Sequence, residues 1–186
     1  MPEEKRTELG SLGEFELINR LVEGFETVNE STVKSIGDDA AVIEYKEGQI
    51  VVSTDLLIEN IHFDLMYTPL KHLGYKAVVV NLSDIYAMNA IPEQITVSIG
   101  VSNRFSLESL DELYDGIKAA CKHYKVDLVG GDTSSSNKGL IISVTAIGRA
   151  LKEDIVYRNT AQLGDLICVT GDLGAAFIGI QILERE

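Results

Sequence analysis

The sequence predicts a mixed α+β fold in which helices and strands form layers. Two long segments have helical periodicity and alternate with short runs rich in β-branched residues, as in α/β or α+β proteins. Of the 186 residues, 45% are apolar and 24% are charged, as in globular proteins and unlike disordered or fibrous chains. We therefore expect one sizeable hydrophobic core.

A helix and a hairpin are the first elements expected along the chain. Apolar residues recur at helical spacing over residues 13–25. Residues 41–45 and 50–54 are short apolar runs separated by a Lys-Glu-Gly turn signal, which predicts a β-hairpin. The acidic pair Asp38 and Asp39 lies at the entrance of this hairpin.

Two long helices are expected next. Thr68 and Pro69 are a typical helix opening, with the hydroxyl as cap and proline in the first turn, and this helix should end near Met88. Its middle part is apolar nearly all round, which predicts burial between layers. Ser106 should cap the second helix, whose apolar stripe continues to Tyr124.

The remaining apolar runs predict strands. Residues 94–101 alternate strictly, so one side of this strand should face the core. Residues 126–130 form a strand that leads into a glycine-rich loop at 130–139, and residues 140–148 form a well-buried strand. A last strand is expected at 166–170.

Changes in composition divide the chain into three parts. Residues 1–12 carry charges of both signs and are expected to be a flexible N-terminus. Residues 13–150 form the main domain. Residues 151–186 contain a polar linker and the start of a second domain, with an apolar helix pattern at 173–183.

Composition and charge narrow the classes of function. A net charge of −13, with only 16 Lys and Arg, argues against nucleic-acid binding, which needs a basic patch. The sequence has neither an apolar run long enough to span a membrane nor a signal or transit peptide, so we expect a cytoplasmic protein. Cys121 and Cys168 lack a CxxC or His-rich neighbourhood, which favours buried, reduced thiols over a disulfide or a zinc site.

Acidic residues stand at strand ends and inside an apolar helix. Asp38 and Asp39 suit an Asx turn as well as a metal site, and Asp55 at a strand end is equally ambiguous. Asp84 lies one helical turn from Asn81 in an apolar surround, so we expect both to be buried. A buried carboxylate must be paired or coordinated, which favours a functional role for Asp84.

The segment around Asp132 combines two glycines with a run of hydroxyl residues, which suits a phosphate or metal but also a flexible polar turn. Carboxylates with hydroxyl neighbours and no His or Cys cluster indicate a site for Mg²⁺ or Mn²⁺, and Mg²⁺ commonly bridges carboxylates to substrate phosphates. This predicts a nucleotide ligand. The P-loop and GxGxxG fingerprints are absent, so phosphate contacts would come from metals, Arg149 and backbone amides. His62 beside Phe63 suits a ligand contact, although such a lone histidine is more often a core or edge residue.

In their order along the chain, several motifs resemble those of thiamine-monophosphate kinase. They are GEFELI at 13–18, GDDAAV at 37–42, STD with NIHF at 53–63, GYKAVVVNLSDIYAMNA at 74–90, GGDT at 130–133 and GRA at 148–150. The resemblance runs from Gly13 to about Leu183 and includes the TGDLG that opens the second domain of that family. The family is related to aminoimidazole-ribonucleotide synthetase, selenophosphate synthetase and the hydrogenase-maturation dehydratase. The resemblance implies an aminoimidazole-ribonucleotide synthetase amino-terminal-like domain, which is half of a dimeric β-barrel flanked by helices.

The resemblance also implies a set of functional residues. The magnesium ligands would be Asp39, Ser53, Thr54, Asp55, Asp84 and Asp132. The ATP contacts would be Gly131, Asp132, Arg149 and Tyr114, and the contact to thiamine phosphate would be His62. No general base is expected, because a phosphate monoester with a second pKa of roughly 6 is already a nucleophilic dianion at neutral pH.

The implied activity is the ATP-dependent phosphorylation of thiamine monophosphate to thiamine diphosphate, within thiamine diphosphate biosynthesis. Several Mg²⁺ ions would assist a direct in-line transfer in a cytoplasmic homodimer. Members of that family are about twice as long, and their carboxy-terminal domain supplies a further metal-binding aspartate and most contacts to the thiamine rings. We therefore hypothesise that this chain binds magnesium nucleotide weakly without turnover. The alternatives are another ATP-using enzyme of the same superfamily and a non-catalytic, dimerising nucleotide-binding fragment.

Overall fold

The computed structural model describes residues 13–36, 42–157, 159–183 and 185, and it confirms the predicted mixed α+β class. The chain divides into two compact units, Met1–Val156 and Tyr157–Glu186. In chain order the elements are α1 (Glu14–Val22), β1 (Thr32–Lys34), β2 (Val42–Ile43), β3 (Gln49–Ile58), α2 (Leu70–Ala87), β4 (Ile91–Val101), α3 (Leu107–Tyr124), β5 (Asp127–Ser135), β6 (Ile141–Ala150) and α4 (Ala175–Leu183).

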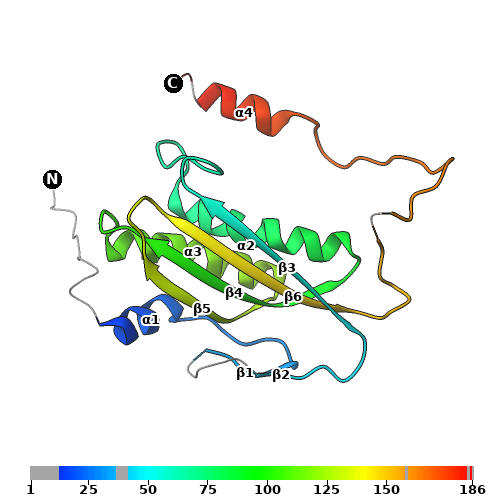
Figure 1. Cartoon of the computed structure of the whole chain (residues 1–186), viewed down its shortest axis with the longest axis horizontal. Coiled ribbons are helices and arrows are strands. Elements are labelled where there is room, and N and C mark those ends of the chain that lie inside the picture. The colour runs from blue at the N-terminus through cyan, green and yellow to red at the C-terminus, as the bar shows by residue number, and fades with distance from the viewer. Residues whose placement is uncertain (1–12, 37–41, 158, 184, 186) are drawn as a thin grey trace. The chain divides into compact units, whose positions relative to one another are not determined.

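A four-stranded sheet in the order β3-β6-β4-β5 organises the first unit (Figure 1). β6 pairs antiparallel with both β3 and β4, whereas β4 and β5 are parallel and are connected through α3. Both α2 and α3 lie against one face of the sheet (Figure 1). On that face the alternating residues Ile142, Val144 and Ala146 of β6 are fully buried.

The two helices pack closely on each other because each contributes a glycine to the contact. A Cβ atom built on Gly74 of α2 would lie 2.0 Å from the Leu113 carbonyl oxygen, and one built on Gly116 of α3 would lie 1.9 Å from the Lys71 carbonyl oxygen. Leu73, which follows Lys71 closely in α2, is fully buried. Glycine at these two positions therefore sets the distance between the helix backbones.

The second face of the sheet is covered at one end, where Gln94 is buried and bonds to Tyr45 and Ser31, and the described residues of this unit leave it open along β3. Along the edge strand β3, the side chains of Ile50, Val52 and Leu56 are 56%, 60% and 49% exposed. Each of these residues alternates with neighbours that face the helices, as expected for a strand. Sheets usually bury their apolar faces against another layer, so the exposed apolar side chains of β3 indicate a surface that another layer could cover.

The expected hairpin of residues 41–45 and 50–54 is wrong. β2 pairs with β1, and β3 instead forms a ten-residue ladder with β6 that begins with Gln49 opposite Ala150. The turn between the two apolar runs does exist, since Gly48 has φ +96° and its backbone lies against Ala150. This turn directs the chain onto the sheet edge, because the long ladder with β6 satisfies more backbone groups than a two-strand hairpin would.

A buried carboxylate holds the segment that leads into β1. Asp127, the first residue of β5, is completely buried and accepts hydrogen bonds from the backbone N–H groups of Val28 and Asn29 at 2.7 and 3.0 Å. It also accepts a bond from the Thr32 hydroxyl at 2.7 Å. These three bonds fix residues 28–32 beside the edge of the sheet.

Most of the other expected elements are present, with shifted ends. α2 begins at Leu70 with Pro69 as its N-cap residue, so the cap expected from Thr68 is wrong. Ser106 caps α3 as expected and accepts a hydrogen bond from the Ser109 N–H at 3.4 Å. The expected loop at 130–139 is wrong in its first half, because β5 continues through Ser135. Pairing with β4 supplies the backbone partners that a loop would lack.

The second unit contains α4, which matches the expected apolar pattern, but the strand expected at 166–170 is not formed. Cys168 in this segment is exposed, which contradicts the expectation of a buried thiol. Cys121 in α3 is buried as expected, and burial is the main cause that raises the pKa of its thiol to about 12. In the described part of the chain, no helix has both the length and the apolar character needed to cross a membrane.

Candidate functional site

The alternation of β3 turns two of the predicted ligand residues toward α2. Ser53 and Asp55 pair with the buried residues Ala146 and Val144 of β6, so their side chains lie on the helix-covered face. The Ser53 hydroxyl donates a hydrogen bond of 2.6 Å to the Asp84 carboxylate of α2. The Asp55 N–H donates one of 2.8 Å to the side-chain oxygen of Asn81. We call Ser53, Asp55, Asn81 and Asp84 the β3–α2 cluster.

Within this cluster the expected burial of Asp84 is wrong. Asn81 is 1% exposed and donates its amide to the Ala77 carbonyl at 2.9 Å, whereas Asp84 is exposed. Three residues rotate an α-helix by about 300°, so Asn81 and Asp84 point in different directions from α2 and only Asn81 is covered. Its carboxylate is therefore open to a ligand from solvent while Ser53 holds one of its oxygens.

Thr54 does not share this cluster. Its hydroxyl lies on the open face, 3.0 Å from the Thr145 hydroxyl and 3.0 Å from the Val144 carbonyl. The period of two in a strand explains why Ser53 and Thr54 are directed to opposite faces.

Gly131 and Asp132 lie on β5, at the opposite edge of the sheet from β3. Three strand spacings separate the two edges, or roughly 14 Å. Asp132 is exposed and pairs in register with Ser98 of β4, while Ser134 donates to its carboxylate at 3.5 Å. A Cβ atom on Gly131 would lie 1.8 Å from the Val97 carbonyl oxygen, so this position requires glycine for the close pairing of β4 and β5.

Arg149 lies at the other end of the sheet. Across the sheet, Asp132 lies in one row with Ser98 and Ser143. Arg149 lies six residues after Ser143 along β6, opposite Ile50 at the start of β3. At about 3.3 Å per residue this separation is roughly 20 Å. The guanidinium donates a hydrogen bond of 2.5 Å to the buried Glu93 carboxylate, which raises the pKa of Arg149.

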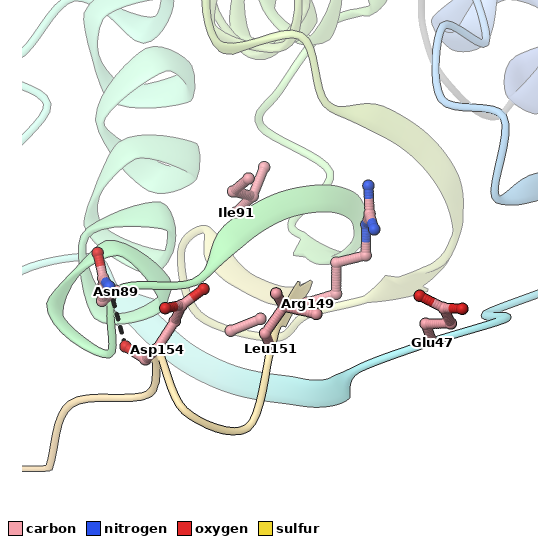
Figure 2. Close-up of a pocket in the computed structure, with 7 residues that line it drawn as sticks. Glu47, Asn89, Ile91, Arg149, Leu151 and Asp154 are labelled. Carbon is pink, nitrogen blue, oxygen red and sulfur yellow. Dashed lines mark hydrogen bonds between the residues drawn. The ribbon is translucent and has the colours of Figure 1, made fainter.

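Arg149 also lines a shallow pocket of about 230 Å³ at this end of the sheet. Figure 2 shows the labelled side chains around it and the hydrogen bond of 2.9 Å from the Asn89 amide to the Asp154 carbonyl. Its lining residues are Glu47, Asn89, Ile91, Arg149, Ala150, Leu151 and Asp154. Of the predicted site residues that the structure describes, Arg149 alone lies in this lining.

Three further predictions have different outcomes. Tyr114 is 6% exposed within the hydrophobic core, and burial raises the pKa of its phenol to about 12, so we withdraw it from the nucleotide contacts. His62 is exposed after the end of β3, and its Nδ1 accepts a hydrogen bond from the Ile58 N–H at 3.1 Å. Asp38 and Asp39 lie outside the described residues.

Residues 37–150 match the family model described as AIR synthase related protein, N-terminal domain. The chain belongs to this family. It is 37% identical over 177 residues to the thiamine-monophosphate kinase of Bacillus subtilis (strain 168), covering 94% of this chain and 54% of that protein. It is 36% identical over 178 residues to that of Aquifex aeolicus (strain VF5), covering 96% and 55%. This AIR synthase related chain therefore spans about half the length of the curated relatives it matches.

Solved structures that share the fold of this AIR synthase related chain include two thiamine-monophosphate kinases. The thiamine-monophosphate kinase of Stenotrophomonas maltophilia K279a has a TM-score of 0.79 and 34% identity, covering 94% of this chain and 54% of that one. AaThiL complexed with AMPPCP and TMP has a TM-score of 0.70 and 32% identity, covering 98% and 56%. The hydrogenase maturation protein HypE in complex with ATP, at 20% identity and a TM-score of 0.64, shares the fold. The expected aminoimidazole-ribonucleotide synthetase amino-terminal-like fold is confirmed.

In this AIR synthase related chain, the donor set of the β3–α2 cluster fits a hard divalent cation. It offers two carboxylates and a hydroxyl, which are oxygen ligands of the type that Mg²⁺ prefers, while the buried Asn81 oxygen accepts the Asp55 N–H. Among the described residues, no group of three or more His, Cys, Asp or Glu could hold a metal ion. Among the predicted ligands that the structure describes, Ser53, Asp55 and Asp84 lie together, whereas Asp132 lies at the far edge of the sheet.

Three buried or nearly buried carboxylates of this AIR synthase related chain were not predicted from the sequence. Glu93 and Asp127 are buried at strand starts, and Glu59 is nearly buried just after β3. The signal in each case is a single carboxylate beside an apolar run, which needs a partner when it is buried. Sequence alone could not name those partners, because Arg104, which pairs with Glu59, lies far away along the chain.

Proposed function

We propose that this chain is the amino-terminal half of a thiamine-monophosphate kinase, which transfers the γ-phosphoryl group of ATP to thiamine monophosphate and yields ADP and thiamine diphosphate. The β3–α2 cluster carries the proposal, because it offers hard oxygen donors at an exposed edge of the sheet. The identity to thiamine-monophosphate kinases over nearly the whole chain supports it, as does a related structure that contains AMPPCP and TMP. We place the reaction in the cytoplasm, as a step of thiamine diphosphate biosynthesis.

The chemistry needs alignment of two anionic reactants more than it needs a base. The acceptor phosphate has a second pKa of roughly 6 and attacks as a dianion, so no side chain has to remove a proton. Bound magnesium ions would supply the positive charge that reduces the repulsion between the two phosphate groups. Asp55 and Asp84 would hold these ions, while Ser53 and Asn81 fix the Asp84 side chain and the Asp55 backbone through bonds of 2.6 and 2.8 Å. The transfer is direct and in line, without a phosphoenzyme.

We infer that the working unit is a homodimer formed through the open face of the sheet. This face exposes Ile50, Val52 and Leu56, which a second copy would cover. A second copy that brings its β5 edge beside β3 would place its Asp132 near the β3–α2 cluster. Such a composite site accounts for the roughly 14 Å that separates the two edges within one chain.

Replacement of Asp84 tests the metal and nucleotide site. Isothermal titration of magnesium-ATP into the chain should show binding, and Asp84→Asn should weaken it at least about tenfold, or about 1.4 kcal/mol, because a metal-ligating charge is lost. Asp115→Asn on the surface of α3 is the matched control, since it removes one exposed carboxylate outside the cluster and should bind like the wild type. Equal binding by Asp84→Asn and Asp115→Asn, or no binding by the wild type, would contradict the proposal.

Mixing two defective variants tests the composite site. Asp84→Asn and Asp132→Asn, dissociated and reassociated together, form heterodimers in which one of the two sites has both carboxylates intact. Random association should therefore restore magnesium-ATP binding in roughly a quarter of the sites. Asp84→Asn mixed with Asp55→Asn is the control and should restore nothing, because both residues lie in the same cluster of one chain. Recovery no greater than in the control mixture would show that the chain does not share its site across a dimer.

A further inference from the structure

A compact turn carries His62 beyond the end of β3. The Asn60 N–H donates to the Phe63 carbonyl at 2.8 Å, and the His62 N–H donates to the Ile58 carbonyl at 2.9 Å. Asn60 adopts φ +63°, which closes the turn tightly. The Lys76 ammonium on α2 donates to the His62 carbonyl at 3.4 Å. The backbone of residues 58–63 is therefore held at several points.

The imidazole of His62 takes part in this turn through one nitrogen. The Ile58 N–H lies 3.1 Å from Nδ1, and since a backbone N–H can only donate, Nδ1 must be the unprotonated acceptor. A neutral ring with an unprotonated Nδ1 carries its proton on Nε2. The side chain is exposed, so this Nε2–H is available to an anionic oxygen.

Glu59 connects the same turn to two other loops through an ion pair and a hydrogen bond. Its side chain is 6% exposed, and one carboxylate oxygen pairs with the Arg104 guanidinium, from the segment between β4 and α3. The other oxygen accepts a hydrogen bond of 2.8 Å from the Leu140 N–H, from the segment before β6. The Glu59 N–H in turn donates to the Leu140 carbonyl at 3.0 Å.

Gly139 lies directly against the Glu59 side chain. It has φ +73°, and a Cβ atom at this position would lie 2.7 Å from the Glu59 carboxylate oxygen. The backbone conformation favours glycine here, and a Cβ atom would also crowd the Glu59 carboxylate. We call Glu59, Arg104, Gly139 and Leu140 the Glu59 clamp.

We propose that Glu59 is a positioning residue, which uses the Glu59 clamp to hold the 58–63 turn so that His62 presents Nε2–H to an anionic phosphate oxygen of the acceptor substrate. The naming of that substrate rests on the proposed function. The control of the His62 tautomer follows from the clamp and the turn alone. Without the clamp, only the turn's own hydrogen bonds and the contact from Lys76 hold residues 58–63, so the Ile58 N–H should hold Nδ1 as an acceptor for a smaller fraction of the time.

Imidazole nitrogen NMR tests this control in the chain as it stands. The sequence has 3 histidines, and His62→Gln identifies the signals of His62. At about pH 8.5, where an ordinary imidazole is neutral, wild-type His62 should show the Nε2–H tautomer. Glu59→Ala and Arg104→Met should each give an average of both tautomers. Should Glu59→Ala fail to fold, Glu59→Gln keeps an acceptor for the Leu140 N–H but loses the charge that faces Arg104, and it should show partial averaging.

Arg20→Met is the matched control. It also removes a guanidinium from an ion pair with a carboxylate, since Arg20 lies 2.8 Å from Asp111 on α3, but it leaves the clamp intact. This variant should keep the Nε2–H tautomer of His62. The proposal is overturned if Glu59→Gln and Arg104→Met keep the wild-type His62 signals, or if wild-type His62 shows the Nδ1–H tautomer.

A titration with thiamine monophosphate separates this proposal from the proposed function. Binding should shift the His62 signals, and Arg104→Met should weaken it about tenfold while Arg20→Met leaves it unchanged. Thiamine monophosphate that shifts no His62 signal contradicts the acceptor site of the proposed kinase, while the tautomer measurement still decides the role of Glu59. Equal affinity of Arg104→Met and Arg20→Met for the ligand contradicts the positioning role.

Discussion

Gly116→Ala should lower the free energy of unfolding by about 3 kcal/mol or more, at the upper end of the cost of overpacking a core. The new methyl group would lie 1.9 Å from the Lys71 carbonyl oxygen and 2.8 Å from the Tyr75 nitrogen. Both are backbone atoms of α2, so the whole helix must move, and this outweighs the gain of about 1 kcal/mol in helix propensity. Urea unfolding followed by circular dichroism measures the difference.

Gly179→Ala is the control for this substitution. Gly179 lies within α4, and a Cβ atom built on it meets nothing within 4 Å apart from the local backbone of that helix, so the same change meets open space. It should leave the unfolding of the first unit unchanged. A Gly116→Ala variant as stable as Gly179→Ala would show that α2 and α3 are not packed at the distance described.

Asp127→Ala should be the other strongly destabilising change, with a loss of about 3–5 kcal/mol. The carboxylate is completely buried, and its removal leaves the N–H groups of Val28 and Asn29 and the Thr32 hydroxyl without their acceptor. Amide hydrogen exchange should show faster exchange at Val28 and Asn29, in addition to the loss of stability on urea unfolding.

Asp111→Ala is the matched control for Asp127→Ala. Asp111 is partly exposed and forms a surface ion pair with Arg20, a type of contact that contributes up to about 1 kcal/mol. Comparable losses of stability in both variants, or unchanged exchange at Val28 and Asn29, would refute the role of Asp127 as the anchor of this segment.

Local sequence patterns predicted the elements whose periodicity reports a single buried face. The strict alternation of residues 94–101 matches β4, and the stripe that begins after Ser106 matches α3. The hairpin at 41–45 and 50–54 failed for a different reason. A short apolar run does not specify its partner, and the partner of β3 is β6, about ninety residues further along the chain.

The glycine-rich segment shows a second limit of sequence reasoning. Glycines and hydroxyl residues at 130–139 indicated a loop, yet β5 runs through Gly131 because this glycine allows the backbone to approach Val97. Propensity was overridden there by pairing with β4.

The candidate site was predictable only in part. Alternation along β3 is enough to place Ser53 and Asp55 on one face and Thr54 on the other. The position of Asp132 depends on the strand order of the sheet, which no local pattern encodes. The exposure of Asp84 depends on how α2 lies against the edge strand, so the apolar residues around it in sequence were misleading.

The pairing of Gln49 with Ala150 has a consequence for how the chain folds. β4 pairs with β5 and β6 across 33 to 58 residues, whereas β3 pairs with β6 across 83 to 101 residues. Closing a loop of about a hundred residues costs roughly 4 kcal/mol of conformational entropy before the ladder of β3 forms. We therefore expect β3 to add to the sheet last. Until β3 pairs, one edge of β6 has unpaired backbone N–H and C=O groups. Refolding at high protein concentration should therefore favour aggregation through this edge over pairing with β3.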